Sequence, residues 1–424
     1  MFNMEKVVIV GVRLNQVKED IFKDELEELK NLAEACEMEA VEYVTQVKDA
    51  VNNNTYVGSG KVEEIKTAIT ACDAEGVVFN DELTPSQISI LSDMLDVSIY
   101  DRTFLILEIF KRRAKTKEAQ LQVELASLKY MLPRLAGLRK GLSRQRGAGG
   151  GFAHGRGAGE TKLELDRRIS SDKIAAIKKE LEELKDLRKQ QRVKRKRNDM
   201  KVVSLVGYTN SGKSTTMNTL LKYSKGIKKE VLEKDMLFAT LETSTRLIDN
   251  EKGKFLLTDT VGFVNKLPHQ LVEAFKSTLE EVSESDLIVH VVDSSNPNFE
   301  KQIEVTNNVL KELKTEAIPT IYAFNKIDKN DSYVYIPSDY VEAVRISASK
   351  DININMLIDL IIKHLYKDYY DVVLFLPYEK QKEFYDIINN GVSCNVSYDD
   401  LGMKVKCRLS EYFYNKYKMY IIEK

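Results

Sequence analysis

The sequence predicts an α/β protein of several domains, with a long helical hairpin near the middle of the chain. Its 424 residues are enough for two to four domains that each bury a core of their own. Short β-rich stretches alternate with amphipathic helical stretches in two separate regions, a pattern typical of parallel α/β domains. Between these regions the apolar residues recur at a helical period, and a glycine-rich stretch interrupts them.

The first region, residues 1–110, is predicted to be a small N-terminal α/β domain. Runs such as VVIVGV and GVVFN alternate with DELEELKNLAEAC and KVEEIKTAITAC. The stretch YVGSGKVEEI at residues 56–65 looks like a phosphate loop, but its spacing is wrong, and Val62 follows Lys61 where a hydroxyl residue would face a metal. We expect a turn there, with Ser59 near a helix start.

Residues 111–197 are predicted to form an antiparallel helical hairpin. Two sets of apolar residues at helical spacing indicate its helices: Leu121, Leu125, Leu128 and Leu132, then Ile174, Ile177, Leu181 and Leu184. The connection RGAGGGFAHGRGAGE, residues 146–160, has seven glycines in fifteen positions. Glycine at this density disfavours both helix and strand, so we expect a loop at the tip of the hairpin. A linker between domains is the alternative.

Basic residues surround this loop, in RLAGLRKGLSRQR before it and in RKQQRVKRKR at residues 188–197. Guanidinium groups bind phosphates and stack on bases, and glycine lets the backbone approach a polyanion closely. We therefore interpret the tip as an RNA-contacting segment that uses Arg144, Arg146, Phe152, His154, Arg156, Arg167 and Arg168. The alternatives are a solvated helix face for the second run and a loop without contacts.

Residues 198–366 are predicted to be a larger α/β domain, and residues 367–424 a small αβ C-terminal domain with a hairpin through VSCNVSYDDLGMKVKC. In the larger domain the strand KVVSLVG runs into GYTNSGKST, which matches G-x-x-x-x-G-K-[ST] and precedes a helical stretch. Backbone N–H groups of such a loop surround phosphate oxygens, with Lys213 on the β- and γ-phosphates and Ser214 on Mg²⁺. The expected phosphate-binding residues are Gly207, Tyr208, Thr209, Asn210, Ser211, Gly212, Lys213, Ser214 and Thr215.

The motif DTVG follows at the end of the next long strand. It supplies Asp259 for the metal and Gly262, whose N–H can contact the γ-phosphate. The next residue is Phe263, where Ras-like enzymes have a glutamine. Because an apolar ring cannot orient water, we expect slow hydrolysis by the isolated protein. Asn210 stands where cation-dependent GTPases of this broad class have an asparagine that helps to hold K⁺; bracing of the loop is the alternative.

Two later motifs indicate guanine. NKID contributes Asn325, Lys326 and Asp328, and the carboxylate of Asp328 can accept from both guanine N1–H and the exocyclic amine. ATP would leave that carboxylate unpaired, so GTP is the expected nucleotide. The stretch SAS follows a later strand as Ser347, Ala348 and Ser349, and the Ala348 N–H is positioned to meet guanine O6.

Composition sets the remaining expectations. The formal net charge is −1, so no global field indicates a polyanionic partner. The four cysteines are widely spaced without a CxxC, which is typical of a reducing cytosol rather than of disulfides or zinc. The N-terminal apolar run is too short for a signal peptide, and no later stretch is long enough to span a bilayer. We expect a cytoplasmic protein without membrane insertion.

The chain resembles the HflX family of GTPases over nearly its whole length. The matching stretches are YVGSGKVEEI, FNDELTPSQ, DRTFLILEIF, AKTKEAQLQVELA, RGAGETKLELDRR, GYTNSGKST, LFATLETSTR and DTVGFVNKLPHQLVEAF. The resemblance implies a GTPase, monomeric when free, that binds the large (50S) ribosomal subunit and its 23S rRNA and splits stalled 70S ribosomes under stress. It also implies that Thr240 is the switch threonine that closes on Mg²⁺ and the γ-phosphate. Where the family usually has Asp-Pro-Thr, this chain has Glu242, Thr243 and Ser244, and loss of the proline should loosen the switch.

Two other functions fit the same residues. One is a ribosome-assembly or RNA-chaperone factor that uses GTP as a timer. The other is a signalling switch that binds proteins and no RNA, which the basic hairpin and glycine tip disfavour.

Overall fold

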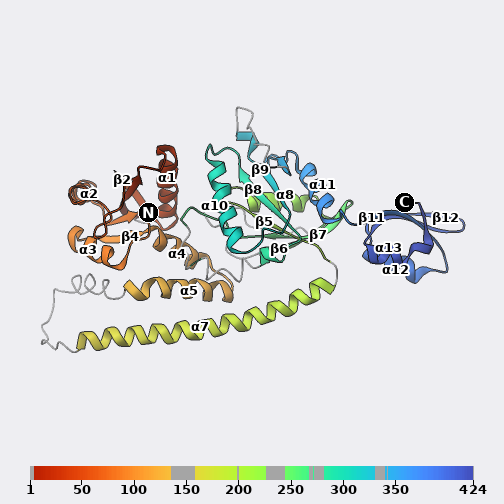
Figure 1. Cartoon of the computed structure of the whole chain (residues 1–424), viewed down its shortest axis with the longest axis horizontal. Coiled ribbons are helices and arrows are strands. Elements are labelled where there is room, and N and C mark those ends of the chain that lie inside the picture. Colours follow the sequence, from red (N-terminus) through yellow and green to blue (C-terminus); the bar gives the residue numbers. More distant parts are fainter. Residues whose placement is uncertain are drawn as a thin grey trace. The chain divides into compact units, whose positions relative to one another are not determined.

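The structure is a computed structural model that describes residues 4–134, 158–197, 200–225, 244–266, 271, 281–329, 340 and 342–423, with side chains of the long helix at 164–187. The chain divides into two compact units, and Figure 1 shows the order of its elements. The first unit comprises Met1–Arg192, Asp235–Glu242 and Phe263–Thr278; the second comprises Val193–Lys234, Thr243–Gly262 and Leu279–Lys424. The chain therefore passes from one unit to the other directly after Gly262.

The N-terminal domain, in the first unit, is built on a four-stranded parallel sheet in the order β2-β1-β3-β4. Residues 7–12 of β1 are all buried, as expected for a parallel strand covered on both faces. Its elements are β1 (Glu5–Leu14), α1 (Glu19–Ala35), β2 (Met38–Lys48), α2 (Ser59–Cys72), β3 (Gly76–Phe79), α3 (Pro85–Leu95), β4 (Ser98–Asp101) and α4 (Arg102–Arg113). Helix α2 begins at Ser59, as predicted.

Two further helices run antiparallel: α5 (Lys117–Met131), followed by a short 3-10 turn (Leu132–Arg134), and α7 (Ala158–Arg197), which belongs to the first unit as far as Arg192. Two ion pairs fix their direction, Lys117–Glu180 at 2.9 Å and Lys173–Glu124 at 2.5 Å. Helix α7 includes residues 158–160, so the expectation of a loop was wrong for the last three residues of the glycine-rich stretch. A first helical turn tolerates glycine better than a helix interior does. The rest of that stretch lies outside the described residues.

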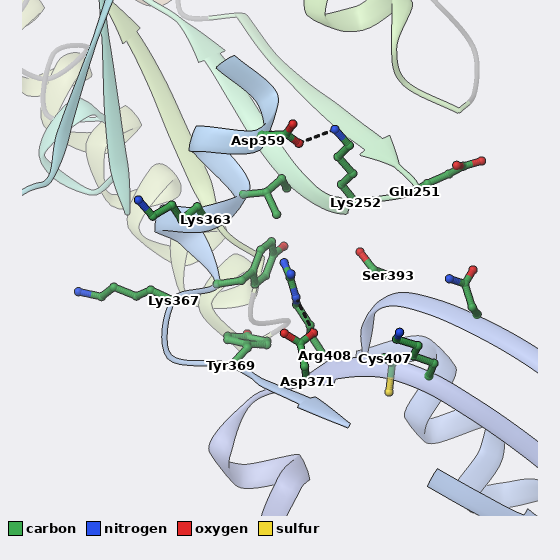
Figure 2. Close-up of a pocket in the computed structure, with 14 residues that line it drawn as sticks. Glu251, Lys252, Asp359, Lys363, Lys367, Tyr369, Asp371, Ser393, Cys407 and Arg408 are labelled. Carbon is green, nitrogen blue, oxygen red and sulfur yellow. Dashed lines mark hydrogen bonds and ion pairs between the residues drawn. The ribbon is translucent and has the colours of Figure 1, made fainter. Parts of the chain in front are cut away.

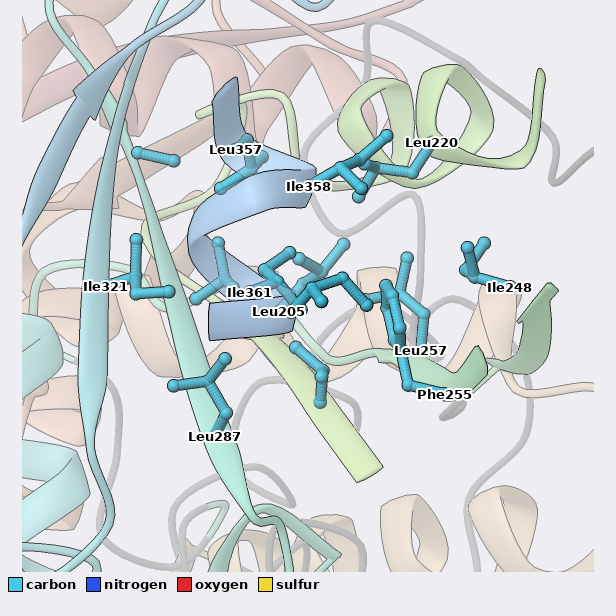
Figure 3. Packing of buried hydrophobic residues seen from close by; sticks show 14 of the residues in the cluster. Leu205, Leu220, Ile248, Phe255, Leu257, Leu287, Ile321, Leu357, Ile358 and Ile361 are labelled. Carbon is cyan, nitrogen blue, oxygen red and sulfur yellow. The ribbon is translucent and has the colours of Figure 1, made fainter. Parts of the chain in front are cut away.

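The second unit contains a six-stranded sheet in the order β10-β9-β8-β5-β7-β6, with every pairing parallel except β6–β7. The β-rich stretches KVVSLVG, KFLLTDT, DLIVHVVD, PTIYAFN and EAVRISA, which the sequence predicts to be strands, correspond to β5, β7, β8, β9 and β10, and β6 is an additional edge strand. The elements are β5 (Val202–Val206), α8 (Lys213–Lys222), β6 (Ser244–Asn250), β7 (Gly253–Asp259), β8 (Leu287–Asp293), α10 (Phe299–Glu312), β9 (Thr320–Asn325), a 3-10 turn (Ile327–Lys329), β10 (Ala343–Arg345) and α11 (Ile354–Leu365). Figure 3 shows α11 packing Leu357, Ile358 and Ile361 into the apolar core of this sheet.

The C-terminal part of the second unit is an antiparallel sheet in the order β12-β13-β11-β14, and β12 and β13 form the predicted hairpin. Its elements are β11 (Tyr370–Pro377), α12 (Gln381–Asn390), β12 (Val392–Asp399), β13 (Gly402–Leu409), α13 (Glu411–Lys416), a 3-10 turn (Lys418–Tyr420) and β14 (Ile421–Glu423). The predicted α/β fold class is confirmed. Across the described residues, no helix is both long and apolar enough to cross a membrane.

Candidate nucleotide-binding site

The predicted phosphate loop connects the end of β5 to the start of α8. Two of its glycines have positive φ angles, 147° at Gly207 and 93° at Gly212. A Cβ on Gly207 would lie 2.2 Å from the carbonyl oxygen of Val291, and one on Gly212 would lie 2.2 Å from Asn325 Nδ2. Both positions therefore require glycine for backbone angle and for space. The loop ends at the N-terminus of α8, where backbone N–H groups favour an anion.

Lys213 is held against its own loop. The side chain is buried, and its ammonium donates to the carbonyl oxygens of Gly207 at 3.0 Å and Tyr208 at 2.7 Å. An ammonium has three N–H donors, so one remains for a phosphate oxygen. Burial lowers the pKa of Lys213 to about 8, although the charge of Asp259 opposes this shift and that of Lys326 adds to it.

The two described candidates for the Mg²⁺ site lie side by side. Ser214, in the first turn of α8, donates from Oγ to Asp259 Oδ2 at 2.8 Å, and Asp259 is fully buried at the end of β7. A hydroxyl and a carboxylate are hard oxygen ligands of the kind Mg²⁺ prefers, so this donor set fits the ion. The third candidate, Thr240, lies outside the described residues.

Gly262 contacts the phosphate loop. A Cβ at this position would lie 2.9 Å from Thr209 Cγ2 and 3.0 Å from Lys213 Nζ. Thr260, two residues earlier, ties the segment to the central strand through a 2.7 Å hydrogen bond from Oγ1 to the carbonyl oxygen of Leu205. The backbone at Gly262 is therefore beside the ammonium that would hold the γ-phosphate. Phe263 is buried, so its ring does not offer a group to orient water.

Asn325 braces the end of the site where the guanine base is expected to bind, here called the base end. Its Nδ2 donates to the carbonyl oxygen of Ser211 at 2.9 Å, and its Oδ1 accepts from the Ala348 N–H at 2.9 Å. This residue connects the end of β9 both to the phosphate loop and to the SAS motif. The Ala348 N–H, expected to meet guanine O6, is therefore engaged with Asn325 in this structure, and contact with the base would share or exchange that hydrogen bond.

Asp328 is exposed at the mouth of the site, and Ser347 orients it. The Ser347 hydroxyl donates to Asp328 Oδ1 at 2.6 Å and lies 3.3 Å from the hydroxyl of Ser349. This hydrogen bond lowers the pKa of Asp328 below its usual range. The carboxylate is consequently ionised at neutral pH and accepts hydrogen bonds, as recognition of the guanine edge requires.

The structure adds two residues that the motifs did not identify, Asp293 and His290. Lys326 has φ of 64° and pairs with Asp293 Oδ2 at 2.7 Å, which holds the turn after β9 against the end of β8. The sequence feature that could have identified Asp293 is its position as the acidic residue at the carboxyl end of the strand DLIVHVVD. His290, on the same strand, is buried, and burial together with the charge of Lys213 lowers its pKa to about 3. Asn210 is exposed on the loop with φ of 59°.

Of the residues expected to contact RNA, Arg167 and Arg168 are exposed on α7. The other five, Arg144, Arg146, Phe152, His154 and Arg156, lie outside the described residues. Arg134, the first residue of the basic stretch before the glycines, is buried instead. It donates to the carbonyl oxygen of Leu83 at 2.6 Å and stacks over the ring of Tyr130.

A separate cavity of about 610 Å³ lies in the second unit, between α11 and the C-terminal sheet (Figure 2). Two ion pairs border it, Lys252–Asp359 and Arg408–Asp371, the latter at 2.8 Å. None of the predicted nucleotide-binding residues lines it. The candidate nucleotide-binding site is therefore not this cavity. It consists of the phosphate loop, the paired Ser214 and Asp259, and Asp328, which Ser347 orients.

Comparisons with known proteins agree with this geometry. Three family models match: GTP-binding GTPase N-terminal at residues 23–111, GTP-binding GTPase Middle Region at 113–195, and 50S ribosome-binding GTPase at 202–326. GTPase HflX of Caldanaerobacter subterraneus subsp. tengcongensis is 42% identical, over 96% of this chain and 91% of that relative. GTPase HflX of Escherichia coli is 39% identical, over 78% and 74% of the two chains.

A crystal structure of a GTP-binding protein from Sulfolobus solfataricus in complex with GDP covers 85% of this chain and 99% of its own, with 24% identity and a TM-score of 0.43. The residues of the site and the extent of the two HflX matches support one conclusion. This chain belongs to the HflX family and is a GTPase.

Proposed function

We propose that this GTPase binds the large ribosomal subunit in the cytoplasm, contacts 23S rRNA with its helical hairpin, and splits stalled 70S ribosomes under stress. The observation that carries the proposal is the antiparallel pair α5–α7, which presents Arg167 and Arg168 to solvent close to the glycine-rich connection. The family model for residues 202–326 is described as a 50S ribosome-binding GTPase, which supports the same partner.

The hairpin suits RNA for physical reasons. Helix α7 is 40 residues long, so the connection lies far along the chain from the nucleotide site. Arginine at the start of such a helix gives planar donors for phosphates and bases, and glycine has no Cβ to keep a polyanion away from the backbone. Aromatic residues in the connection would add about 1 to 3 kcal/mol for each base they stack on.

In the hydrolytic site, Lys213 would bind the β- and γ-phosphates, while Ser214, Asp259 and Thr240 would hold Mg²⁺. The metal would supply charge neutralisation on the transferring phosphoryl group. Gly262 donates its backbone N–H to the γ-phosphate. Because Phe263 is buried and apolar, a group other than this side chain orients the attacking water, and we expect ribosomes to stimulate a slow intrinsic rate.

Sucrose-gradient sedimentation of 70S ribosomes tests the proposal. The full chain with GTP or a non-hydrolysable analogue should convert 70S particles into subunits and remain with the 50S fraction, whereas GDP should not support this. Intact 70S particles under all nucleotides would reject splitting. Retention on free 50S subunits alone would favour the assembly factor, and absence from every ribosomal fraction would favour a protein-binding switch.

Two matched variants test the hairpin. R167Q/R168Q removes two charges near the tip, and K178Q/K179Q removes two charges from exposed positions farther along the same helix. The first should weaken binding to 50S subunits and lower its salt dependence, and the second should have the smaller effect. Equal effects would show that general charge on α7, rather than the tip, contributes the binding. Replacement of residues 147–159 by a short neutral turn should abolish splitting without loss of GTP binding.

A further inference from the structure

Two of the four cysteines lie opposite one another in the C-terminal sheet. All four have free thiols, with Cys394 in β12 and Cys407 in β13. The antiparallel register of these strands shifts between Val392 and Asn395. In this β-bulge, Ser393 and Cys394 both stand opposite Cys407. Opposed residues of an antiparallel pair have Cα atoms about 4.5–5.5 Å apart, which is within the range that a disulfide spans.

Both side chains lie on the same face of this sheet. Cys407 belongs to the apolar core between the sheet and helices α12 and α13, and Cys394 packs against that core. Gly391 shows how near they are: a Cβ at this glycine would lie 2.7 Å from Cys394 Sγ and 3.5 Å from Cys407 Cβ. Cys394 Sγ also lies 3.9 Å from the carbonyl oxygen of Ile387. The two cysteines therefore flank the same small space beside Gly391, where one sulfur can reach the other.

The two thiols differ in reactivity. The Cys407 thiol donates a hydrogen bond to Cys394, which lowers the pKa of Cys394; burial opposes this shift, and the charge of Lys254 adds to it. The same hydrogen bond and burial raise the pKa of Cys407. Cys394 is half-buried, whereas Cys407 is buried. Because the thiolate is the nucleophilic form, these differences favour Cys394 as the sulfur that attacks first and Cys407 as the sulfur that follows.

The bulge is also where the C-terminal sheet contacts the GTPase sheet within the second unit. Val392, the first residue of β12, belongs to the core of the GTPase sheet, and a Cβ on Gly253 would lie 3.2 Å from its Cγ1. Lys254 donates to the carbonyl oxygen of Asn389 at 3.2 Å. Figure 2 shows Cys407 beside the cavity at this contact. A bridge across the bulge would therefore fix the strand that makes the contact.

The other two cysteines, both in the N-terminal domain, serve as internal references. Cys36 is buried, donates to the carbonyl oxygen of Leu105 at 3.5 Å, and has its pKa raised to about 12 by burial. It should therefore resist oxidation. Cys72 ends α2 and is half-buried, as Cys394 is, so it shows what partial exposure alone does.

We propose that Cys394 and Cys407 are a reversible redox site, which hydrogen peroxide converts into a disulfide. The Cys394 thiolate attacks a peroxide oxygen, the O–O bond breaks, and the sulfur becomes a sulfenic acid; the hydroxide released takes up a proton and leaves as water. The Cys407 sulfur then attacks Cys394, the S–O bond breaks, and the hydroxyl leaves with the Cys407 proton as a second water. The two thiols thereby lose two electrons and two protons, and a small-molecule dithiol restores them by thiol–disulfide exchange. This proposal rests neither on GTP hydrolysis nor on ribosome binding.

Peptide mapping of the full chain tests the proposal. Reduced protein is treated with hydrogen peroxide or with buffer alone, unfolded in excess alkylating reagent, and digested with trypsin. Trypsin separates the two cysteines, because they fall in the peptides 383–404 and 407–408. In monomeric protein, peroxide should protect two of the four thiols from alkylation and yield one cross-linked species that joins these peptides and disappears with dithiothreitol. Absence of this species, or a bridge to Cys36 or Cys72, would overturn the proposal.

Three serine variants identify the attacking sulfur. Cys407→Ser removes the second thiol, so Cys394 should remain a sulfenic acid that dimedone captures. Cys394→Ser should give neither a dimedone adduct at Cys407 nor a bridge. Cys72→Ser is the matched control, because it makes the same change at another half-buried cysteine, and it should form the bridge as the parent does. Dimedone capture at Cys407 rather than at Cys394 would overturn the order of attack, and if a variant does not fold, the peptide map of the parent decides on its own.

Discussion

The two ends of the nucleotide site are built in different ways. At the base end, side chains hold one another: Ser347 orients Asp328, and Asn325 joins the phosphate loop to Ala348. At the phosphate end, backbone makes the site: Lys213 donates to loop carbonyls, and glycine leaves room where a Cβ would collide. We therefore expect base selection to depend on side-chain chemistry and phosphate binding to depend on backbone position. Substitutions at the base end should therefore change the choice of nucleotide, and substitutions at the phosphate end should change the rate of hydrolysis.

The largest effect is expected from Asp328→Asn. The amide replaces an acceptor with a donor opposite guanine N1 and N2, so GTP affinity should fall by about 10³-fold or more. Affinity for xanthosine triphosphate should rise, because xanthine has a carbonyl oxygen at C2 that accepts from the amide N–H, while its N1–H still donates to the amide oxygen. Titration with both nucleotides measures the change, and unchanged GTP affinity would contradict the assignment of the base end.

At the phosphate end, Gly262→Ala should act on hydrolysis rather than on base recognition. The added Cβ would meet Thr209 and Lys213 at about 3 Å and displace the backbone N–H from the γ-phosphate. We expect kcat to fall by roughly 100-fold, as for loss of one transition-state donor, with GDP affinity close to that of the parent. Single-turnover kinetics measure the effect. Gly60→Ala is the control, since nothing lies within 4 Å of a Cβ there.

His290 makes the region beneath the phosphate end sensitive to acid. Its native pKa of about 3 is below the ordinary value of 6.5. Between these two pH values the unfolded chain therefore binds a proton at this residue, whereas the native chain does not. This contribution to stability is complete above about pH 6.5 and is lost as pH falls toward 3, at about 1.4 kcal/mol per pH unit. Urea unfolding of His290→Leu at pH 7.5, 6.5 and 5.5 should show a correspondingly shallower pH dependence. An identical slope would contradict the shift.

The smallest effect concerns the choice of monovalent cation. If Asn210 helps to hold K⁺ against the phosphates, hydrolysis should be several-fold faster in KCl than in NaCl. Asn210→Gly keeps the left-handed backbone at φ of 59° and removes the amide, so it should abolish that preference. Steady-state rates in both salts, with and without ribosomes, measure it. Equal rates for the parent would show that the residue only braces the loop.

The sequence predicted the parts of this molecule that depend on local spacing. The parallel strands of the first two sheets follow from β-rich runs between helical stretches, and the loop from Gly207 to Thr215 follows from one motif in one context. Ser214 and Asp259, predicted as partners of one ion, lie in contact. Local sequence pattern is sufficient to predict these elements, because the residues that define each element are close together in the chain.

The rest depends on pairs far apart in the chain. Arg134 belongs to a basic stretch by sequence, yet its guanidinium is buried against Leu83 and Tyr130. Asn325 was identified by the NKID motif, but its role as a brace depends on Ser211 and Ala348, which only the folded chain brings to it. The sequence shows which charged and polar side chains are present, but their contact partners are determined by tertiary packing.

The passage of the chain between units after Gly262 also has a consequence for how the protein is made. Glu25 and Arg102 are buried and are translated well before Asn265 and Lys266, with which they form hydrogen bonds. At ordinary elongation rates of about 5–20 residues per second, the gap is on the order of 10 to 50 s. During that interval the N-terminal domain has its strands and helices but not these partners for two buried charges. Formation of these contacts therefore waits for synthesis of the GTPase sequence as far as Lys266.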